Sequence, residues 1–273
     1  MQLIPIPSCP DCNYYLCSDF HEGSIAQAVN DVDKLIKNIQ DDPIARVSIL
    51  GDLLEAFWVD DPRYDQETAV ETPLKQRKNI IEKLSCISGK LDCILMGNHE
   101  RKLLNKVGNI TKDICDELKV NYGTYSSKLE FQDGFKFFIT HGMRNINSMS
   151  PDPIRRKAYM EFTLKRHLEQ KAADCLVMSK GHSHKLLIAE PLPQLYLVTD
   201  KGKLRQGYTK PGARDVYIPP EHRWYCNTGS FLKTQVLGCS TYSEVFELDP
   251  VETGYIIVRI RDKHVQACEK VIV

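Results

Sequence analysis

Hydrophobic residues in the first third of the chain follow two alternating patterns. Three short apolar runs, at residues 14–17, 47–50 and 91–96, have the length and the continuous hydrophobicity of buried strands. Between these runs, apolar residues recur every three or four positions, as they do on one face of an amphipathic helix. This strand–helix–strand–helix–strand order predicts parallel strands covered by helices, and therefore an α/β fold.

Local signals predict where the two helices begin and end. The first helix, with its apolar face over residues 25–39, is expected to begin at a capping box that starts with Ser24. The second helix is expected to begin at Thr72-Pro73, because proline is favoured in the first helical turn, and to stop near Gly89.

The pattern becomes richer in strands beyond residue 120. The expected elements are a hairpin of residues 129–131 and 135–140, a helix over 153–171, a strand over 175–179, a hairpin of residues 195–199 and 204–208, and β-rich runs over 243–248 and 255–260. The chain has no internal repeat and no linker with a shift in composition. The simplest organisation is one domain, residues 1–273, that contains two sheets.

Composition excludes several classes of protein. Of 273 residues, 42% are hydrophobic and 26% are charged, which is typical of a folded globular chain. Lysine plus arginine and aspartate plus glutamate both number 36, so the chain is not a generally basic nucleic-acid coat. No apolar run approaches the length of a membrane span, and the N-terminus lacks the pattern of a signal peptide. We therefore expect a cytoplasmic protein, whose ten cysteines form no disulfides.

Polar side chains able to bind a metal directly follow five apolar strands. Because ligands gather beyond the carboxyl ends of the strands in α/β sheets, we expect these side chains to converge. Five of the eight histidines belong to these clusters. Each cluster alone also fits an ordinary cap, turn or surface histidine, but together they favour a metal site. The clusters are Asp19-x-His21, Gly51-Asp52-x-x-Glu55, Gly97-Asn98-His99-Glu100, His141-Gly142 and Gly181-His182-x-His184.

The order of these motifs resembles the calcineurin-like metallophosphoesterase superfamily. The resemblance, which runs from Asp19 to His184, implies a four-layer α-β-β-α sandwich of two mixed β-sheets flanked by helices. It implies two metal ions between the strand ends, and a role for His99 in contacting phosphate and protonating the leaving group. The implied ligands are Asp19, His21, Asp52 and His184 for one metal, and Asp52, Asn98, His141 and His182 for the other, with Asp52 bridging.

The chemistry of phosphoester hydrolysis supports this interpretation independently. Two divalent ions about 3.5–4 Å apart neutralise the phosphoryl oxygens and lower the pKa of a bridging water. Mixed aspartate, histidine and asparagine donors suit Mn, Fe or Zn better than Mg or Ca, and we expect Mn first. The resulting hypothesis is attack by a metal-bridging hydroxide, with Asp52 and His99 as catalytic residues and Asn98 and His99 beside the phosphate.

Three segments are candidates for the rim that selects the substrate. The aromatic residues Phe57, Trp58 and Tyr64 are suited to stack on a base, and residues 201–223 are either a flap or an ordered loop. Residues 142–171 are locally basic, and Arg144, three residues beyond His141, is our candidate for contacting the substrate, with Arg155 and Arg156 as candidates for holding a second phosphate. These features favour a phosphodiesterase that acts on a nucleotide or a nucleic acid.

Two alternatives stay open at the level of sequence. Residues 51–58 are similar to a stretch of the UDP-diacylglucosamine pyrophosphatases, although those enzymes carry arginine where this chain has His99. A catalytically silent scaffold on the same fold is the other alternative, although silent relatives typically lose metal ligands and none is missing here. The oligomeric state is not evident from the sequence.

Overall fold

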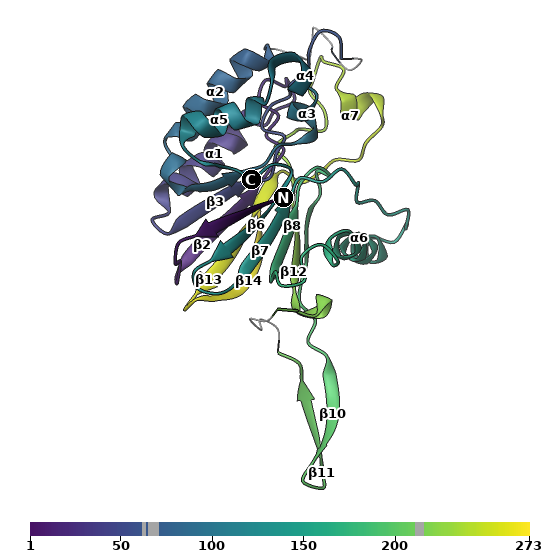
Figure 1. Ribbon diagram of the computed structural model, residues 1–273. Coiled ribbons are helices and arrows are strands. Elements are labelled where there is room, and N and C mark those ends of the chain that lie inside the picture. The colour runs from purple at the N-terminus through teal and green to yellow at the C-terminus, as the bar shows by residue number, and fades with distance from the viewer. Residues whose placement is uncertain (62–63, 65–70, 211–215) are drawn as a thin grey trace.

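Two six-stranded mixed sheets pack face to face and are flanked by helices (Figure 1). This computed structural model describes the chain except for residues 62–63, 65–70 and 211–215. The layers run helix, sheet, sheet, helix, which confirms the expected four-layer α-β-β-α sandwich. In the described part of the chain, no helix is long and apolar enough to cross a membrane.

The first sheet contains the three apolar runs that begin the chain's α/β pattern. Its order is β14-β13-β2-β3-β4-β5, in which β2 to β5 are parallel and β13 and β14 are antiparallel. The expected parallel arrangement is therefore confirmed. The strands are β2 (Cys12–Cys17), β3 (Ala45–Ile49), β4 (Leu91–Ile94), β5 (Asn121–Tyr122), β13 (Gly254–Arg261) and β14 (His264–Ile272).

The second sheet has the order β1-β6-β7-β8-β12-β9. Strands β7, β8 and β12 are parallel, so β7 and β8 end at the same edge, and we call the edge where β2, β3, β4, β7 and β8 end the carboxyl edge. The strands are β1 (Gln2–Ile6), β6 (Ser126–Phe131), β7 (Lys136–Thr140), β8 (Val177–Lys180), β9 (Leu186–Ala189) and β12 (Trp224–Thr228). The pairing of β6 with β7 confirms the first expected hairpin.

Three apolar cores hold the four layers together. One core lies between the two sheets, a second lies between the first sheet and α1, α2 and α5, and a third lies between the second sheet and α6. The helices are α1 (Val29–Asp41), α2 (Pro73–Ser85), α3 (Asn98–Arg101), α4 (Leu104–Val107), α5 (Ile110–Leu118), α6 (Pro153–Leu168) and α7 (Tyr242–Val245), with single 3-10 turns η1 (Ser88–Lys90) and η2 (Pro220–His222).

The structure corrects two helix boundaries. Helix α1 begins at Val29 with Ala28 as its N-cap, so the capping box predicted at Ser24 is wrong. The Gln27 side chain instead donates to the Phe20 carbonyl, which holds this segment as a loop. Helices α2 and α6 start as predicted but end earlier than expected.

The two ends of the chain supply the remaining corrections. Cys9 and Cys12 form a disulfide, so the expectation of no disulfides is wrong; their spacing across a turn brings the two Cα atoms to 5.8 Å. The run 243–248 is not a strand, because the Thr241 hydroxyl accepts from the Glu244 amide and caps the short helix α7. Strand β1 was not predicted.

The second expected hairpin is confirmed and projects from the sandwich (Figure 1). It consists of β10 (Leu195–Asp200) and β11 (Lys203–Tyr208), and we call it the arm. The arm lies between the end of β9 and the start of β12 in the chain. Because β12 is parallel to β8, its start lies at the edge opposite the carboxyl edge. The arm therefore points away from the five polar clusters.

Candidate metal centre

All five polar clusters meet at the carboxyl edge, where loops from both sheets cross each other. The Asp19 amide donates to the Gly51 carbonyl, which joins the loops after β2 and β3. The Asp19 carboxylate accepts from the His182 amide, which joins the two sheets. The parallel strands thus bring together side chains that are up to 165 positions apart, as the sequence predicted.

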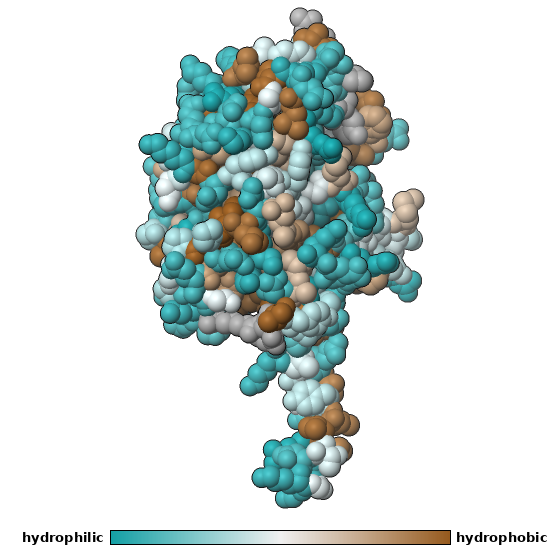
Figure 2. All heavy atoms as spheres, viewed as in Figure 1, coloured by the Kyte–Doolittle hydropathy of each residue, from teal (hydrophilic) through white to brown (hydrophobic). Residues whose placement is uncertain are grey.

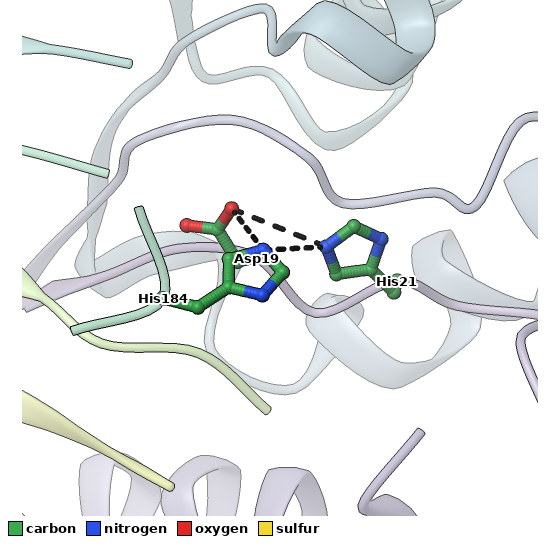
Figure 3. Close-up of side chains that lie close together, drawn as sticks. All are labelled: Asp19, His21 and His184. Atoms are coloured by element: carbon green, nitrogen blue, oxygen red, sulfur yellow. Dashed lines mark hydrogen bonds and ion pairs between the residues drawn. The ribbon is translucent and has the colours of Figure 1, made fainter. Parts of the chain in front are cut away.

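Asp19, His21 and His184 form one group (Figure 3). The Nε2 atom of His184 lies 3.2 Å from Oδ1 of Asp19 and 3.3 Å from Nε2 of His21. The His21 Nε2 atom lies 4.0 Å from the same Asp19 oxygen. Three donor atoms of different residues converging at this spacing are suited to surround one ion.

Asp52, His141 and His182 form a second group, to which Asn98 also belongs. The His141 Nε2 atom lies 3.2 Å from Oδ2 of Asp52 and 3.0 Å from Oδ1 of Asn98. The Asn98 Oδ1 atom lies 2.6 Å from Nδ1 of His182. The donor atoms of His21, Asp52 and His99 also lie within 4.8 Å of one another. Asp52 is therefore close to donors of both groups, where a bridging carboxylate is expected.

The imidazole rings are oriented by partners outside the two groups. The His21 Nδ1 atom lies 2.8 Å from a carboxylate oxygen of Glu55. The His141 Nδ1 atom donates to the Leu50 carbonyl at 2.6 Å. A histidine that binds a metal through one nitrogen usually donates the other N–H to such a partner, which fixes its tautomer. Both rings thus present Nε2 to the centre.

The donor set itself fits a cation. Within the described residues, Oδ1 of Asp19 is a buried carboxylate oxygen that has no hydrogen-bond donor, whereas its Oδ2 accepts from Ser18 and from the His182 amide. A buried anionic oxygen without a donor is costly unless a cation or proton compensates it. That oxygen points at the His184 and His21 nitrogens, so these residues fit a divalent ion.

The backbone around the donors is strained. Positive φ is uncommon outside glycine and costs of order 1–3 kcal/mol, so it persists only where the surrounding structure imposes it. Here the strain accompanies convergence of the donors at one edge. Five of the seven candidate ligands have positive φ: Asp19 (56°), His21 (51°), Asp52 (50°), His182 (72°) and His184 (52°).

Glycine is required beside one of these strained positions. A Cβ atom on Gly97 would collide with the Asp52 carboxylate and backbone amide. The loops after β3 and β4 therefore approach each other closely only because residue 97 has no side chain. The same approach lets the His99 amide donate to Oδ1 of Asp52 at 2.9 Å.

Electrostatic coupling shifts the pKa of the central groups in opposite directions. Burial alone would raise the pKa of the Asp52 carboxyl, but the His141 and His99 imidazoles lower it well below its usual range. Burial alone would lower the pKa of His21, but the neighbouring Glu55 carboxylate raises it to about 9. Burial alone would also lower the pKa of His141, but the Asp52 carboxylate raises it to about 9. Without metal, the centre therefore holds protons that a cation must displace.

His99 lies at the border of the centre, next to the rim. Its ring stacks on the Phe57 ring at a centroid distance of 5.3 Å and meets the His21 ring edge-on at 4.7 Å. Its Nδ1 atom donates to the Glu55 carbonyl at 2.7 Å. Burial lowers the pKa of His99. The ring is thus held in place by Phe57 and Glu55, with Nε2 as its remaining polar atom.

Arg144, the predicted substrate contact, lies in an exposed loop that a buried residue anchors. The Lys180 ammonium, at the end of β8, donates to the Arg144 carbonyl. The Lys180 side chain also packs beneath Gly142, where an added Cβ atom would lie 3.3 Å from its Cε. Burial lowers the pKa of Lys180 to about 8. The structure thus ties the Arg144 loop to the edge of the centre. Residues 62–63 and 65–70, on either side of the predicted rim residue Tyr64, and residues 211–215 of the expected flap or loop lie outside the described residues.

Sequence reasoning missed three residues that support the centre. Ser18 donates to Asp19 and lies 2.5 Å from the Thr228 hydroxyl oxygen, which links β2 to β12. Thr228 is distant in sequence and carries no motif that would have identified it. Lys180 had a weak signal, since a lysine is unusual at the end of a buried strand.

Comparisons with known proteins place this centre in a family. A sequence comparison with curated proteins gave no match. Solved structures that resemble the chain include a hypothetical protein from Pyrococcus horikoshii (9% identity, 96% of this chain and 88% of that one, TM-score 0.47), a nuclease from Pseudomonas putida (12%, 94% and 87%, 0.37) and a protein serine/threonine phosphatase from Saccharomyces cerevisiae (10%, 100% and 84%, 0.40).

The sequence match to a family model is more specific. Residues 13–187, well over half of the chain, match the calcineurin-like phosphoesterase model. That range includes all five polar clusters and the strands that position them. The chain therefore belongs to the calcineurin-like phosphoesterase family and is a metal-dependent phosphoesterase.

Proposed function

We propose that this chain is a two-metal phosphodiesterase that acts on a nucleotide or a nucleic acid. The observation that carries the proposal is the position of Asp52 between two groups of donors, which is the arrangement a bridging carboxylate needs. Asp19, His21, Asp52 and His184 would hold one divalent ion, and Asp52, Asn98, His141 and His182 would hold the other. Two such ions supply charge neutralisation for the phosphoryl oxygens and an acidified water. The mixed donors favour Mn over Mg.

The chain's own residues complete the reaction around the phosphate. Asn98, whose Oδ1 belongs to the second group of donors, would orient a phosphoryl oxygen through its side-chain N–H. In this proposal His99 protonates the departing oxygen: Nδ1–H is committed to the Glu55 carbonyl, and the imidazolium form, which an anionic phosphate favours, carries the transferable proton on Nε2. A His99 held between Phe57 and His21 needs little reorganisation to do so.

A pocket lined by chain neighbours of Phe57 supports a substrate with a base. The pocket has a volume of about 480 Å³ and is lined in part by Ala56 and Trp58, the chain neighbours of Phe57, whose ring stacks on His99. Its cations, Lys102 and Lys106, form ion pairs with Asp61 and Asp60. One aromatic ring, that of Trp58, together with paired charges suits a neutral, flat group such as a nucleobase better than a second phosphate. In the same proposal the protein is cytoplasmic, since eight of its ten cysteines are free thiols.

A comparison of two chromogenic esters tests this proposal. We expect Mn-loaded protein to hydrolyse bis-p-nitrophenyl phosphate at least about tenfold more efficiently than p-nitrophenyl phosphate. Arg144→Ala should lower kcat/KM for the diester by about tenfold, the worth of one charge-assisted hydrogen bond. Lys157→Ala, an exposed lysine on α6, is the matched control and should change nothing. A preference for the monoester that Arg144→Ala leaves unaltered would contradict the phosphodiesterase proposal, and an absence of bound metal would favour a silent scaffold.

A further inference from the structure

The two faces of the arm differ in polarity. In the β10–β11 register, the uncharged polar residues Thr199 and Gln206 share one side of the ribbon with four apolar residues, Leu195, Leu197, Leu204 and Tyr208. These four residues, which we call the arm face, are 53%, 61%, 62% and 71% exposed in the order Leu195, Tyr208, Leu197 and Leu204. Figure 2 shows apolar side chains along the arm between the body and a hydrophilic tip. None of the four residues is charged.

The opposite face of the arm is largely satisfied by its own side chains. The Tyr196 ring covers Gly207, where an added Cβ atom would lie 2.9 Å from it. Arg205 pairs with Asp200 at 3.1 Å. The cations of the ribbon therefore lie on this face or at the tip, and the arm face is left as an uncharged surface. An uncharged face does not attract the phosphates of a nucleic acid.

Among the strands in the described part of the chain, β10 and β11 pair only with each other, and the arm projects from the sandwich (Figure 1). An isolated two-stranded hairpin is marginally stable in water, and a hydrophobic face has to be covered for such a ribbon to be independently stable. The arm extends about 20 Å, six residues at about 3.4 Å each, beyond the edge opposite the metal centre. It is too far from the carboxyl edge to cover the substrate.

We propose that the arm is a dimerisation element and that its occupant is the arm face of a second copy of this chain. Two identical, uncharged faces can pack against each other about a two-fold axis, as in an isologous interface. In the pair, the two arms point in opposite directions. If they pointed in the same direction, the two bodies would have to lie side by side, which their bulk prevents. Each tip then reaches the base of the other arm, where Leu192 and Tyr217 are 70% and 58% exposed.

The available area is sufficient for a specific but weak dimer. Each of the four residues of the arm face presents on the order of 100 Å², so two facing arms bury roughly 800 Å². The residues at the base bring the total to about 1,200 Å², the lower end of the range for specific interfaces. We therefore expect dissociation in the micromolar range rather than an obligate dimer.

Sedimentation equilibrium over about 1–200 μM, with the full-length protein, tests the proposal. The wild-type mass should rise from 31.2 kDa toward twice that value. Leu197→Asp and Leu204→Asp, on the arm face, should each keep the protein monomeric throughout. Val198→Asp, on the opposite face of the same strand, is the matched control and should dimerise like the wild type.

Hydrolysis of bis-p-nitrophenyl phosphate serves as the folding control, since it depends on residues at the other edge. All three variants should retain the wild-type rate. A wild type that stays monomeric at 200 μM, a dimer that both arm-face variants preserve, or open-ended assembly instead of a dimer would each overturn the proposal. The proposal would also be overturned if the protein stayed monomeric and its arm bound a duplex oligonucleotide through Lys203 and Arg205.

Discussion

The two opposite edges of the sandwich differ in which groups they bury and which they expose. At the carboxyl edge, buried charged groups converge under backbone strain, and each is held by partners such as Glu55 and the Leu50 carbonyl. At the other edge, the arm exposes apolar side chains on a regularly paired ribbon, in which positive φ outside glycine is confined to Lys201 in the turn. Strain and burial accompany chemistry, whereas regularity and exposure accompany association. Each edge can therefore be damaged without the other, and this separation can be tested.

The largest effect is expected from Asp52→Asn. Removing the charge that both groups of donors share should abolish binding of at least one metal ion, weaken the second, and lower kcat by 1,000-fold or more. Metal content by elemental analysis, together with hydrolysis of bis-p-nitrophenyl phosphate, measures both consequences. His184→Ala should chiefly weaken the binding of one of the two ions. Protein that keeps two ions and full activity after Asp52→Asn would contradict the bridging role.

A smaller effect, and a selective one, is expected from His99→Ala. General acid catalysis contributes typically 10²–10⁴-fold, and it matters most when the leaving group is poor. Hydrolysis of an alkyl phosphodiester should therefore slow by about 100-fold or more, whereas that of a p-nitrophenyl ester should slow far less. Metal content should not change. Equal losses for the two esters would show that His99 only binds or positions the substrate.

Glu55→Gln tests whether the outer partners of the histidines matter. The substitution keeps the shape of the side chain but removes the carboxylate that orients His21. Metal affinity should fall by about 10–100-fold, as is usual when the partner of a metal-binding histidine is lost. Titration against a competing chelator measures it, and Glu130→Gln, at a half-buried position on β6, is the control. Unchanged affinity would mean that His21 is oriented by packing alone.

The pH dependence of the metal-free protein sharpens the electrostatic side of the comparison. His21 and His141 have a folded-state pKa of about 9, above the ordinary 6.5. Their contribution to stability is therefore fully present below about pH 6.5 and is lost as the pH rises through about 9. Thermal unfolding in a chelator should show a Tm that falls over this window, and added Mn should reduce the fall. A metal-free Tm that rises between pH 6.5 and 9 would contradict the assigned coupling.

The smallest effect on activity is expected at the arm. Leu197→Asp should leave kcat/KM within twofold of the wild-type value, because the arm lies at the edge away from the metal centre. Enzyme assays at 1 μM, where the dimer is dissociated, and at 100 μM measure this. A large loss at both concentrations would show that the two edges are coupled.

The accuracy of prediction from sequence also differed between the two edges. The residues that converge at the carboxyl edge were predictable, because parallel strands bring their ends together. His141 and His182, for example, each come within two residues of the end of such a strand. The positive φ of Asp19 and the hydroxyl of Thr228 were not predictable, since both depend on contacts between distant loops. The hairpin of the arm was evident from the two β-rich runs that flank residues 200–203, but its projection into solvent depends on the tertiary structure and is not encoded in any local pattern.

Local propensity failed where loop contacts overrode it. Ser24 and Gln27 have the spacing of a capping box, yet the Gln27 side chain donates to the Phe20 carbonyl instead. The β-branched and aromatic run that begins at Ser243 was expected to be a strand, yet the hydroxyl of Thr241 caps a helical turn there. In both places a single side-chain hydrogen bond outweighs a weak intrinsic preference.

The donors of the metal centre come from both sheets, and this has a consequence for how the protein unfolds. Asp19, Asp52 and Asn98 follow strands of the first sheet, whereas His141 and His182 follow strands of the second. Ions held there would cross-link the two halves of the sandwich at one edge. Separation of the sheets would then require release of the ions first, so bound metal should slow unfolding and protect amides in both sheets from hydrogen exchange. The cofactor of the reaction would thus also set the lifetime of the folded chain.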